Sequence, residues 1–274
     1  MPFTAAAVIL QAHWWATQIL AVSIWTVGLS VLLGIVVLKL RAATLGAAAA
    51  GAVITASLMF STLTFPYRPW LTALLPVLAV SLLAHFATRI GRRKKEQLGT
   101  AEARRGRTAS QVAANLGLAS LVSFPIFQSW LLDSPYFARA ALGSVPFFAI
   151  SLAALAEAAA DTVSSEIGQV FGGRPRMITT LRLADAGIDG GITFAGTAAG
   201  ILAAAIVSGI GVFALQGSFA MFFVSTAGAV FGLFFDSLLG ATLERRGWLN
   251  NDAVNFLSTA SATAFSLVFL AFRT

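Results

Sequence analysis

Carboxylates occur inside an apolar stretch of this sequence, where charge is costly and usually serves a function. Glu157, Asp161 and Ser165 follow one another at intervals of four residues, which places them on one face of a helix. Mg²⁺ prefers oxygen ligands, typically one or two carboxylates together with substrate phosphates and water. We therefore predict that Asp161 and Glu166 bind Mg²⁺, with Glu157 deeper in the helix. The alternative for either ligand is an ion pair with a loop arginine such as Arg174.

A loop rich in arginine and glycine follows this helix. Its arginines are Arg174, Arg176 and Arg182, and Gly190 and Gly191 stand near its end. Guanidinium groups and unhindered backbone amides are well suited to binding phosphate. The loop therefore predicts phosphate binding next to the carboxylates, with Arg174 as a catalytic residue.

The densest positive charge lies in a basic segment upstream. Three of its arginines stand just before a predicted helix: Arg104, Arg105 and Arg107. Arginines and glycine at a helix N-terminus form an anion site. Gln111 and Asn115, one turn apart in that helix, would line the site or join neighbouring helices by hydrogen bonds. The alternative for the whole segment is charge that sets membrane topology or contacts anionic lipid.

A third acidic position, Asp236, belongs to a periodic seam in a later apolar stretch. The seam repeats every fourth residue and comprises Gly228, Gly232, Asp236 and Gly240. Small residues at this spacing let helices approach closely. We expect Asp236 to ligate the same metal or a second one. The alternative is a buried hydrogen bond to the asparagines that follow, which include Asn251 and Asn255.

The composition is that of an integral membrane protein. Hydrophobic residues make up 58% of the chain and charged residues 11%, with a mean hydropathy of +0.84. The absence of cysteine excludes disulfides and thiolate metal sites. The net charge of +7 could indicate nucleic acid, but the basic residues concentrate between apolar stretches, which membrane topology explains better. We therefore predict an all-α, polytopic helical bundle that binds no nucleic acid.

The apolar stretches predict about eight transmembrane helices, with seven as the alternative, because a spanning helix needs ~20 residues. They lie at about 17–38, 42–63, 69–90, 110–131, 139–161, 192–213, 217–240 and 253–272. With the N-terminus outside, 15 of the 18 Lys and Arg residues fall in inner loops. Because basic loops usually lie on the cytoplasmic side, this charge bias would place the acidic motifs on the cytoplasmic face of a prokaryotic inner or plasma membrane.

The expected organisation is one integral membrane domain over residues 1–274. It would comprise N-terminal helices (1–90), a basic cytoplasmic loop (91–109) and a catalytic helical core (110–274).

Several separated motifs resemble the membrane family that contains the phytyl-phosphate kinases of tocopherol and chlorophyll-phytol salvage and animal transmembrane protein 19. In chain order they read RRGRTASQVAANLG, DTVSSEIG, RPRMITTLR, GIDGGITFAG, GLFFDSLLGATLE and NNDAVNFLSTASA. By this resemblance Asp161, Ser165 and Glu166 match an acidic motif at a helix end. Asp189 stands where the family often has asparagine, so its role stays open. The C-terminal motifs are matched by Asp236, Asn251 and Asn255.

The resemblance implies transfer of a phosphoryl group from a nucleoside triphosphate, with CTP favoured, to an isoprenoid monophosphate. Mg²⁺ on Asp161, Asp236 and Glu166 would bridge the phosphates. The arginines that would hold nucleotide and acceptor are Arg104, Arg105, Arg107 and Arg174. The prenyl tail would lie among the Phe- and Leu-rich spans, with its phosphate at the inner interface. A CTP-dependent lipid cytidylyltransferase and a secondary transporter remain alternatives, and the prenyl chain and oligomeric state stay open.

Overall fold

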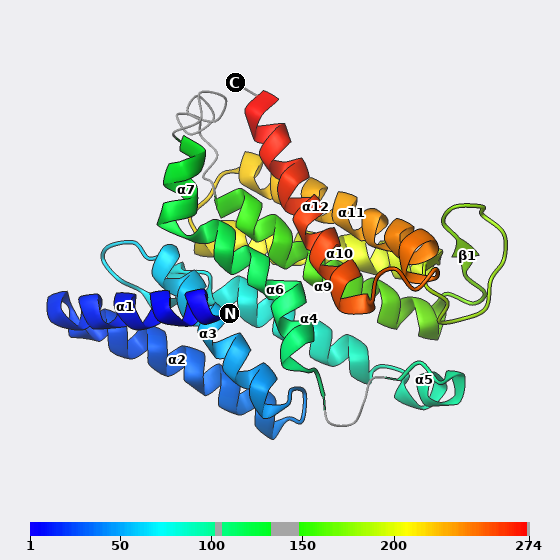
Figure 1. Cartoon of the computed structure of the whole chain (residues 1–274), viewed down its shortest axis with the longest axis horizontal. Helices are drawn as coiled ribbons and strands as arrows, with labels where there is room; N and C mark the ends of the chain where they lie inside the picture. Colours follow the sequence, from blue (N-terminus) through cyan, green and yellow to red (C-terminus); the bar gives the residue numbers. More distant parts are fainter. Residues whose placement is uncertain (102–105, 133–147, 273–274) are drawn as a thin grey trace.

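The computed structural model describes residues 1–101, 106–132 and 148–272 of the chain. The first helices are α1 (Pro2–Gln18), α2 (Leu20–Lys39), α3 (Leu45–Ser61) and α4 (Leu74–Arg89), with a 3-10 turn η1 (Pro69–Leu71) before α4. Next come α5 (Arg92–Leu98), α6 (Ala109–Ser123), α7 (Pro125–Leu132) and α9 (Phe148–Phe171). A ribbon of β1 (Arg176–Met177) and β2 (Gly191–Ile192) precedes α10 (Phe194–Ala214), α11 (Phe219–Leu239), the π-helical turn η2 (Gly240–Glu244) and α12 (Asn251–Phe272). The predicted helical membrane fold is confirmed (Figure 1).

The prediction of eight spans is too high for the described residues. Five helices are long and apolar enough to cross a membrane, namely α2, α9, α10, α11 with η2, and α12. A sixth results if α4 and α5, which meet at 65°, form one broken span. Helices α3 and α6 have only 17 and 15 residues, short of the ~20 that a straight crossing needs. Helix α6 ends early because Phe124, which precedes a proline, is extended.

Helix α9 is the centre of the bundle. It packs against α4, α6, α10, α11 and α12, and most of it is buried (Figure 1). Its many alanines, such as Ala153 and Ala160, keep its surface narrow enough for these neighbours to approach. The helix runs ten residues past the predicted end at 161. Residues 139–147 of that predicted span lie outside the described part of the chain.

The glycine seam of α11 forms the predicted close helix contacts. A Cβ atom on Gly228 would lie 2.7 Å from the carbonyl oxygen of Ala262 on α12. On Gly232 it would lie 2.6 Å from Cγ of Glu157 on α9 and 2.9 Å from the Ser258 carbonyl oxygen. Only glycine therefore fits at these two positions without displacing a neighbour.

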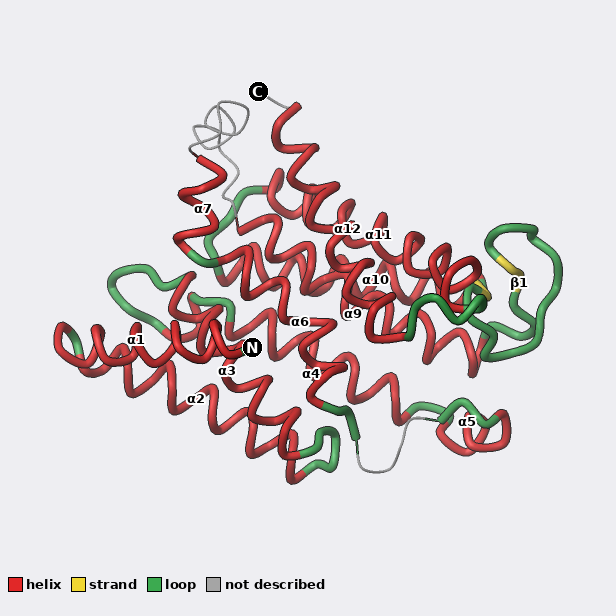
Figure 2. Tube along the Cα trace, in the orientation of Figure 1, coloured by secondary structure: helices red, strands yellow, loops and turns green. Residues whose placement is uncertain are grey.

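The four connections predicted to lie on one side of the membrane meet at one end of the bundle. The α2–α3 turn pairs with the start of α6 through a parallel bridge between Ala43 and Arg107. Figure 2 shows α5 and the β1–β2 loop beyond the same ends of the helices. The Lys94 ammonium donates to the carbonyl oxygen of Val170, the residue before the last in α9. Part of the predicted basic loop is thus the helix α5, tied to the end of α9.

Candidate functional site

A polar cavity of about 500 Å³ lies at this end of the bundle, between α6, α9, α11 and the loop that carries the β-ribbon. Residues from all four regions line it, although they are far apart in the sequence. The predicted site residues that line it are Arg107, Gln111, Asn115, Asp161, Ser165, Glu166, Asp189, Gly190, Gly191, Asp236, Asn251 and Asn255. The structure therefore collects most of the sequence motifs around one cavity.

Asp161 on α9 and Asp236 on α11 face each other in this cavity and interact electrostatically. Oδ2 of Asp236 is buried and accepts no hydrogen bond from the part of the chain that the structure describes. Both carboxylate oxygens of Glu157 also accept no hydrogen bond in the described residues, and Glu157 is only 1% exposed. Ser258 lies close enough to interact with Glu157 and Asp236, but its hydroxyl donates to Asn255 O at 2.9 Å. Buried carboxylates without donors are costly unless a cation or donor meets them. This arrangement is expected of a site that receives a positive ligand.

The oxygen atoms that the cavity offers can be compared with the ligands that Mg²⁺ prefers. Within the described ranges, no three or more acidic, histidine or cysteine side chains are grouped to hold a metal ion alone. Mg²⁺ commonly takes only one or two carboxylates from the protein and completes its shell with phosphate and water. Asp161 and Asp236 offer that kind of all-oxygen pair, with one oxygen unsatisfied. The residues therefore fit Mg²⁺ in the presence of a phosphate ligand.

Glu166 has a protein partner. Its Oε2 accepts from the Lys95 ammonium at 2.5 Å, and Lys95 is 1% exposed. The same ammonium donates to the carbonyl oxygens of Ala87 at 3.1 Å and Thr88 at 2.7 Å, in the last turn of α4. The ion pair that the sequence left open for Glu166 is thus present, but Lys95 supplies the cation. We assign Glu166 to holding α4, α5 and α9 together, and direct metal ligation by it remains a prediction.

Arg107 is the described arginine of the basic segment that enters the cavity. Its backbone is fixed by hydrogen bonds with the α2–α3 turn, from Thr44 N to Arg107 O (2.9 Å) and from Arg107 N to Ala42 O (3.0 Å). Its guanidinium Nη2 donates to Thr162 Oγ1 at 3.2 Å and lies near enough to Asp161 to interact electrostatically. Arg107 therefore brings positive charge to the carboxylate pair. Arg104 and Arg105 lie outside the described residues.

The N-terminus of α6 is less open to an anion than its sequence predicted. Thr108 and Gln111 form a capping box, in which Thr108 Oγ1 accepts from Gln111 N and Gln111 Oε1 accepts from Thr108 N. Two of the free helix donors are thus already satisfied. The Asn115 amide donates to Gln111 O within the same helix at 2.9 Å.

The three arginines of the loop after α9 are placed differently from the prediction. Arg174, Arg176 and Arg182 are exposed, and none of these three described residues lines the cavity. The Arg176 guanidinium donates to Leu181 O at 2.8 Å, which directs it along its own loop. Within the ribbon, exposed Arg176 alternates with buried Met177, as expected for successive residues of a strand. Phosphate binding by the three arginines remains a prediction.

The glycines of this loop pack against the end of α11. Gly190 has φ +76°, and a Cβ there would collide with the backbone of Ala241 in η2. This close approach brings Asp189 to the same cavity as Asp236. A glycine is required because a side chain would both strain the left-handed backbone and push the loop away.

Sequence reasoning missed four lining or supporting residues. Glu244 lines the cavity from the π-helical turn η2, eight residues after Asp236, and π turns are frequent at functional sites. Glu244 could have been predicted as a site residue, because it belongs to the same motif as Asp236, GLFFDSLLGATLE. Thr162 and Thr193 also line the cavity. Lys95 carried no specific signal, because it stands among other basic residues.

Comparison with known proteins agrees with the motif pattern. The model of the family described as Integral membrane protein DUF92 matches residues 28–263. An uncharacterised membrane protein of Synechocystis is 32% identical over 205 residues, which is 70% of this chain and 72% of that protein. One of Methanocaldococcus jannaschii is 42% identical over 108 residues, which is 39% of this chain and 45% of that protein.

A plant protein is also similar. Protein VTE6, chloroplastic, of Arabidopsis thaliana is 27% identical over 219 residues, which is 78% of this chain and 63% of that protein. The matches thus span less than two thirds of the Methanocaldococcus and Arabidopsis proteins. No solved structure matches the chain. Because the family model covers most of the sequence, this chain belongs to the integral membrane family DUF92.

Proposed function

We propose that this protein is an isoprenoid-monophosphate kinase, which transfers a phosphoryl group from a nucleoside triphosphate to a prenyl monophosphate. The observation that carries the proposal is the meeting of Asp161 and Asp236 in one polar cavity beside Arg107. Phosphoryl transfer needs little covalent chemistry from a protein. It needs aligned substrates and neutralised phosphate charge.

In the proposed reaction a terminal oxygen of the prenyl monophosphate attacks the γ-phosphorus of the nucleotide. The bond between that phosphorus and the β–γ bridging oxygen breaks, and the nucleoside diphosphate leaves with its electron pair. The acceptor is an anion at neutral pH, so no strong general base is required. Mg²⁺, when bound by Asp161 and Asp236, would neutralise charge on the nucleotide phosphates.

Arg107 would hold phosphate in this cavity. Its guanidinium can form two parallel hydrogen bonds to one phosphate. The backbone hydrogen bonds to the α2–α3 turn fix its position before any ligand binds. We assign Asn251 and Asn255, which line the cavity from α12, to orienting the substrates through their amides.

Family membership supports the choice of substrate class. The family indicated by the motifs includes phytyl-phosphate kinases, and we propose CTP as donor and phytyl or a related prenyl monophosphate as acceptor. We further propose that the cavity faces the cytoplasm. The reason is that the connections around it carry most of the basic residues, which usually lie on that side.

The proposal is tested with purified protein in detergent, Mg²⁺, labelled CTP or ATP, and phytyl, geranylgeranyl or farnesyl monophosphate. A kinase gives the prenyl diphosphate and a nucleoside diphosphate. A cytidylyltransferase gives a CMP-linked lipid and pyrophosphate, which would refute the kinase proposal. A transporter consumes no nucleotide, and that result would refute it as well.

Two substitutions test the carboxylate pair directly. Asp161→Asn and Asp236→Asn should each lower kcat at least about 100-fold, since each removes charge stabilisation from the reacting phosphates. Their melting temperatures should match the wild type. Asp185→Asn, on the loop after α9, is the matched control, because Asp185 is exposed and does not line the cavity. Near-normal rates in both cavity variants would remove the basis of the proposal.

A further inference from the structure

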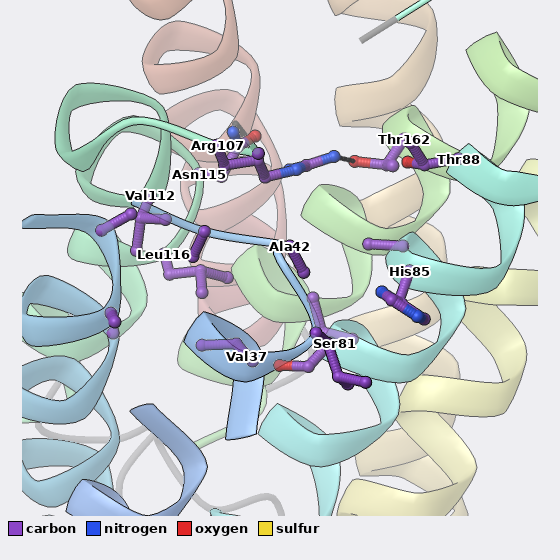
Figure 3. Close-up of a pocket in the computed structure, with 18 of the residues that line it drawn as sticks. Val37, Ala42, Ser81, His85, Thr88, Arg107, Val112, Asn115, Leu116 and Thr162 are labelled. Carbon is purple, nitrogen blue, oxygen red and sulfur yellow. Dashed lines mark hydrogen bonds between the residues drawn. The ribbon is translucent and has the colours of Figure 1, made fainter. Parts of the chain in front are cut away.

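A second cavity, of about 390 Å³, lies among the N-terminal helices, a region to which the sequence motifs assigned no site. Helices α2, α3, α4 and α6 enclose it, and α9 contributes Ala158 and Thr162. Its volume falls within the ~300–1,000 Å³ range of small-molecule sites. Figure 3 shows this cavity with Arg107 reaching towards Thr162 at one side, while Val37 and Ser81 line the part farther from that contact.

The two cavities are adjacent and share part of their lining. Gly106, Arg107, Asn115 and Thr162 line both the polar cavity and the second one. Beyond these residues the second cavity is lined mainly by small or apolar side chains, such as Val77 and Ala84. A phosphate beside Arg107 would therefore lie at the boundary of this apolar space.

The charge around the second cavity also fits an amphipathic anion. Three further arginines line it, and all lie towards the end where the polar cavity is: Arg41, Arg89 and Arg92. Glu96 is the acidic residue among its described lining residues, and it forms an ion pair with Arg92 at 3.2 Å. Positive charge near one end and apolar walls at the other match an anionic head with a hydrocarbon chain.

The length of the cavity suits such a chain. Its lining on α4 runs from Val77 to Arg89, which are twelve helical steps apart, or ~18 Å at the helical rise of 1.5 Å per residue. The space exists because alanine and glycine face it from α3. A Cβ atom added to Gly51 would have Val112 Cγ1 at 4.0 Å as its nearest neighbour, so this position borders open space.

We propose that this cavity binds the prenyl chain of the monophosphate substrate, with the phosphate held at Arg107 where the two cavities meet. The proposal rests on the proposed kinase function. It narrows the predicted place of the tail, among the Phe- and Leu-rich spans, to the space between α2, α3, α4 and α6. Residues that border the cavity and leave it open, such as Gly51, then determine the accepted chain length.

The first test measures how KM depends on chain length. Gly51→Leu fills part of the cavity, so the ratio of KM for geranylgeranyl monophosphate to KM for dimethylallyl monophosphate should rise at least about tenfold. This is the effect of excluding roughly two methylene groups from an apolar site. Gly28→Leu, at an exposed glycine of α2 with nothing within 4 Å, is the matched control and should leave the ratio unchanged. An unchanged ratio in folded Gly51→Leu protein would overturn the proposal.

The second test does not depend on turnover. A geranylgeranyl monophosphate with a diazirine at its last isoprene unit is photolysed on the wild-type protein in nanodiscs, and the labelled peptides are identified by mass spectrometry. Label should appear in α3 and α4 and be displaced by unlabelled geranylgeranyl monophosphate. Label confined to other helices, or displaced equally well by phosphatidic acid, would overturn the proposal. Failure of the kinase assay with displaceable label in α3 and α4 would reject the reaction but keep the binding site.

Discussion

The buried Lys95–Glu166 ion pair allows a quantitative test of how the basic segment is held to the core. We consider Lys95→Met, which keeps an unbranched apolar stem but removes the ammonium. The carboxylate of Glu166, 9% exposed as a residue, then loses its cation. The carbonyl groups of Ala87 and Thr88 at the end of α4 lose a donor at the same time.

The expected loss of stability follows from these contacts. Removing one partner of a buried ion pair costs about 3–5 kcal/mol. Because Glu166 also lines the polar cavity, water can reach it, and we expect the lower end, about 3 kcal/mol. For a chain of this size that corresponds to a fall in melting temperature of roughly 6–12 °C.

The assay is thermal unfolding of purified protein in one detergent, followed by circular dichroism. The double variant Lys95→Met/Glu166→Gln should recover at least half of the loss, because no uncompensated charge remains. Arg92→Met is the control on the same helix. Its pair with Glu96 is 35% and 40% exposed, so the loss should stay below about 1 kcal/mol. A Lys95→Met variant that melts within about 3 °C of wild type would refute the reasoning.

Three further predictions concern the helix seam and the polar cavity. Gly232→Ala should lower the melting temperature, because the added Cβ would lie 2.6 Å from Cγ of Glu157. The control Gly117→Ala should not lower it, because nothing lies within 4 Å of the added Cβ. Equal melting temperatures of the two variants would contradict the close packing at Gly232. Arg107→Lys should raise KM for the nucleotide or for the prenyl monophosphate roughly tenfold, since lysine lacks the planar guanidinium that forms two parallel hydrogen bonds to phosphate. Unchanged KM values for both substrates would leave Arg107 with a structural role only. Glu157→Gln should melt no lower than wild type, because the nearby Ser258 hydroxyl donates to Asn255 O and neither carboxylate oxygen of Glu157 accepts a hydrogen bond in the described structure. A fall of more than about 5 °C would show that the fold needs the charge.

The local features of this protein could be predicted from the sequence because neighbouring residues encode them. Apolar composition specified a helical membrane protein, and spacing by four placed Glu157 and Asp161 on one face of a helix. The same periodicity identified Gly228 and Gly232 as a contact surface, which the structure confirms. The number of spans was overestimated because hydropathy does not register where a proline or a short helix ends a segment.

The tertiary structure alone decided which distant groups meet. Lys95 and Glu166 are 71 residues apart, and their pairing requires α5 to turn back at Gly91, whose left-handed backbone lies directly against Val170. Arg174 stays exposed although its sequence neighbourhood resembles a phosphate loop. The apolar cavity beside Arg107 is a space left between four helices, and no single helix encodes such a space. Periodicity along a chain determines the faces of each helix, but only the packing of those faces determines the cavities and ion pairs between them.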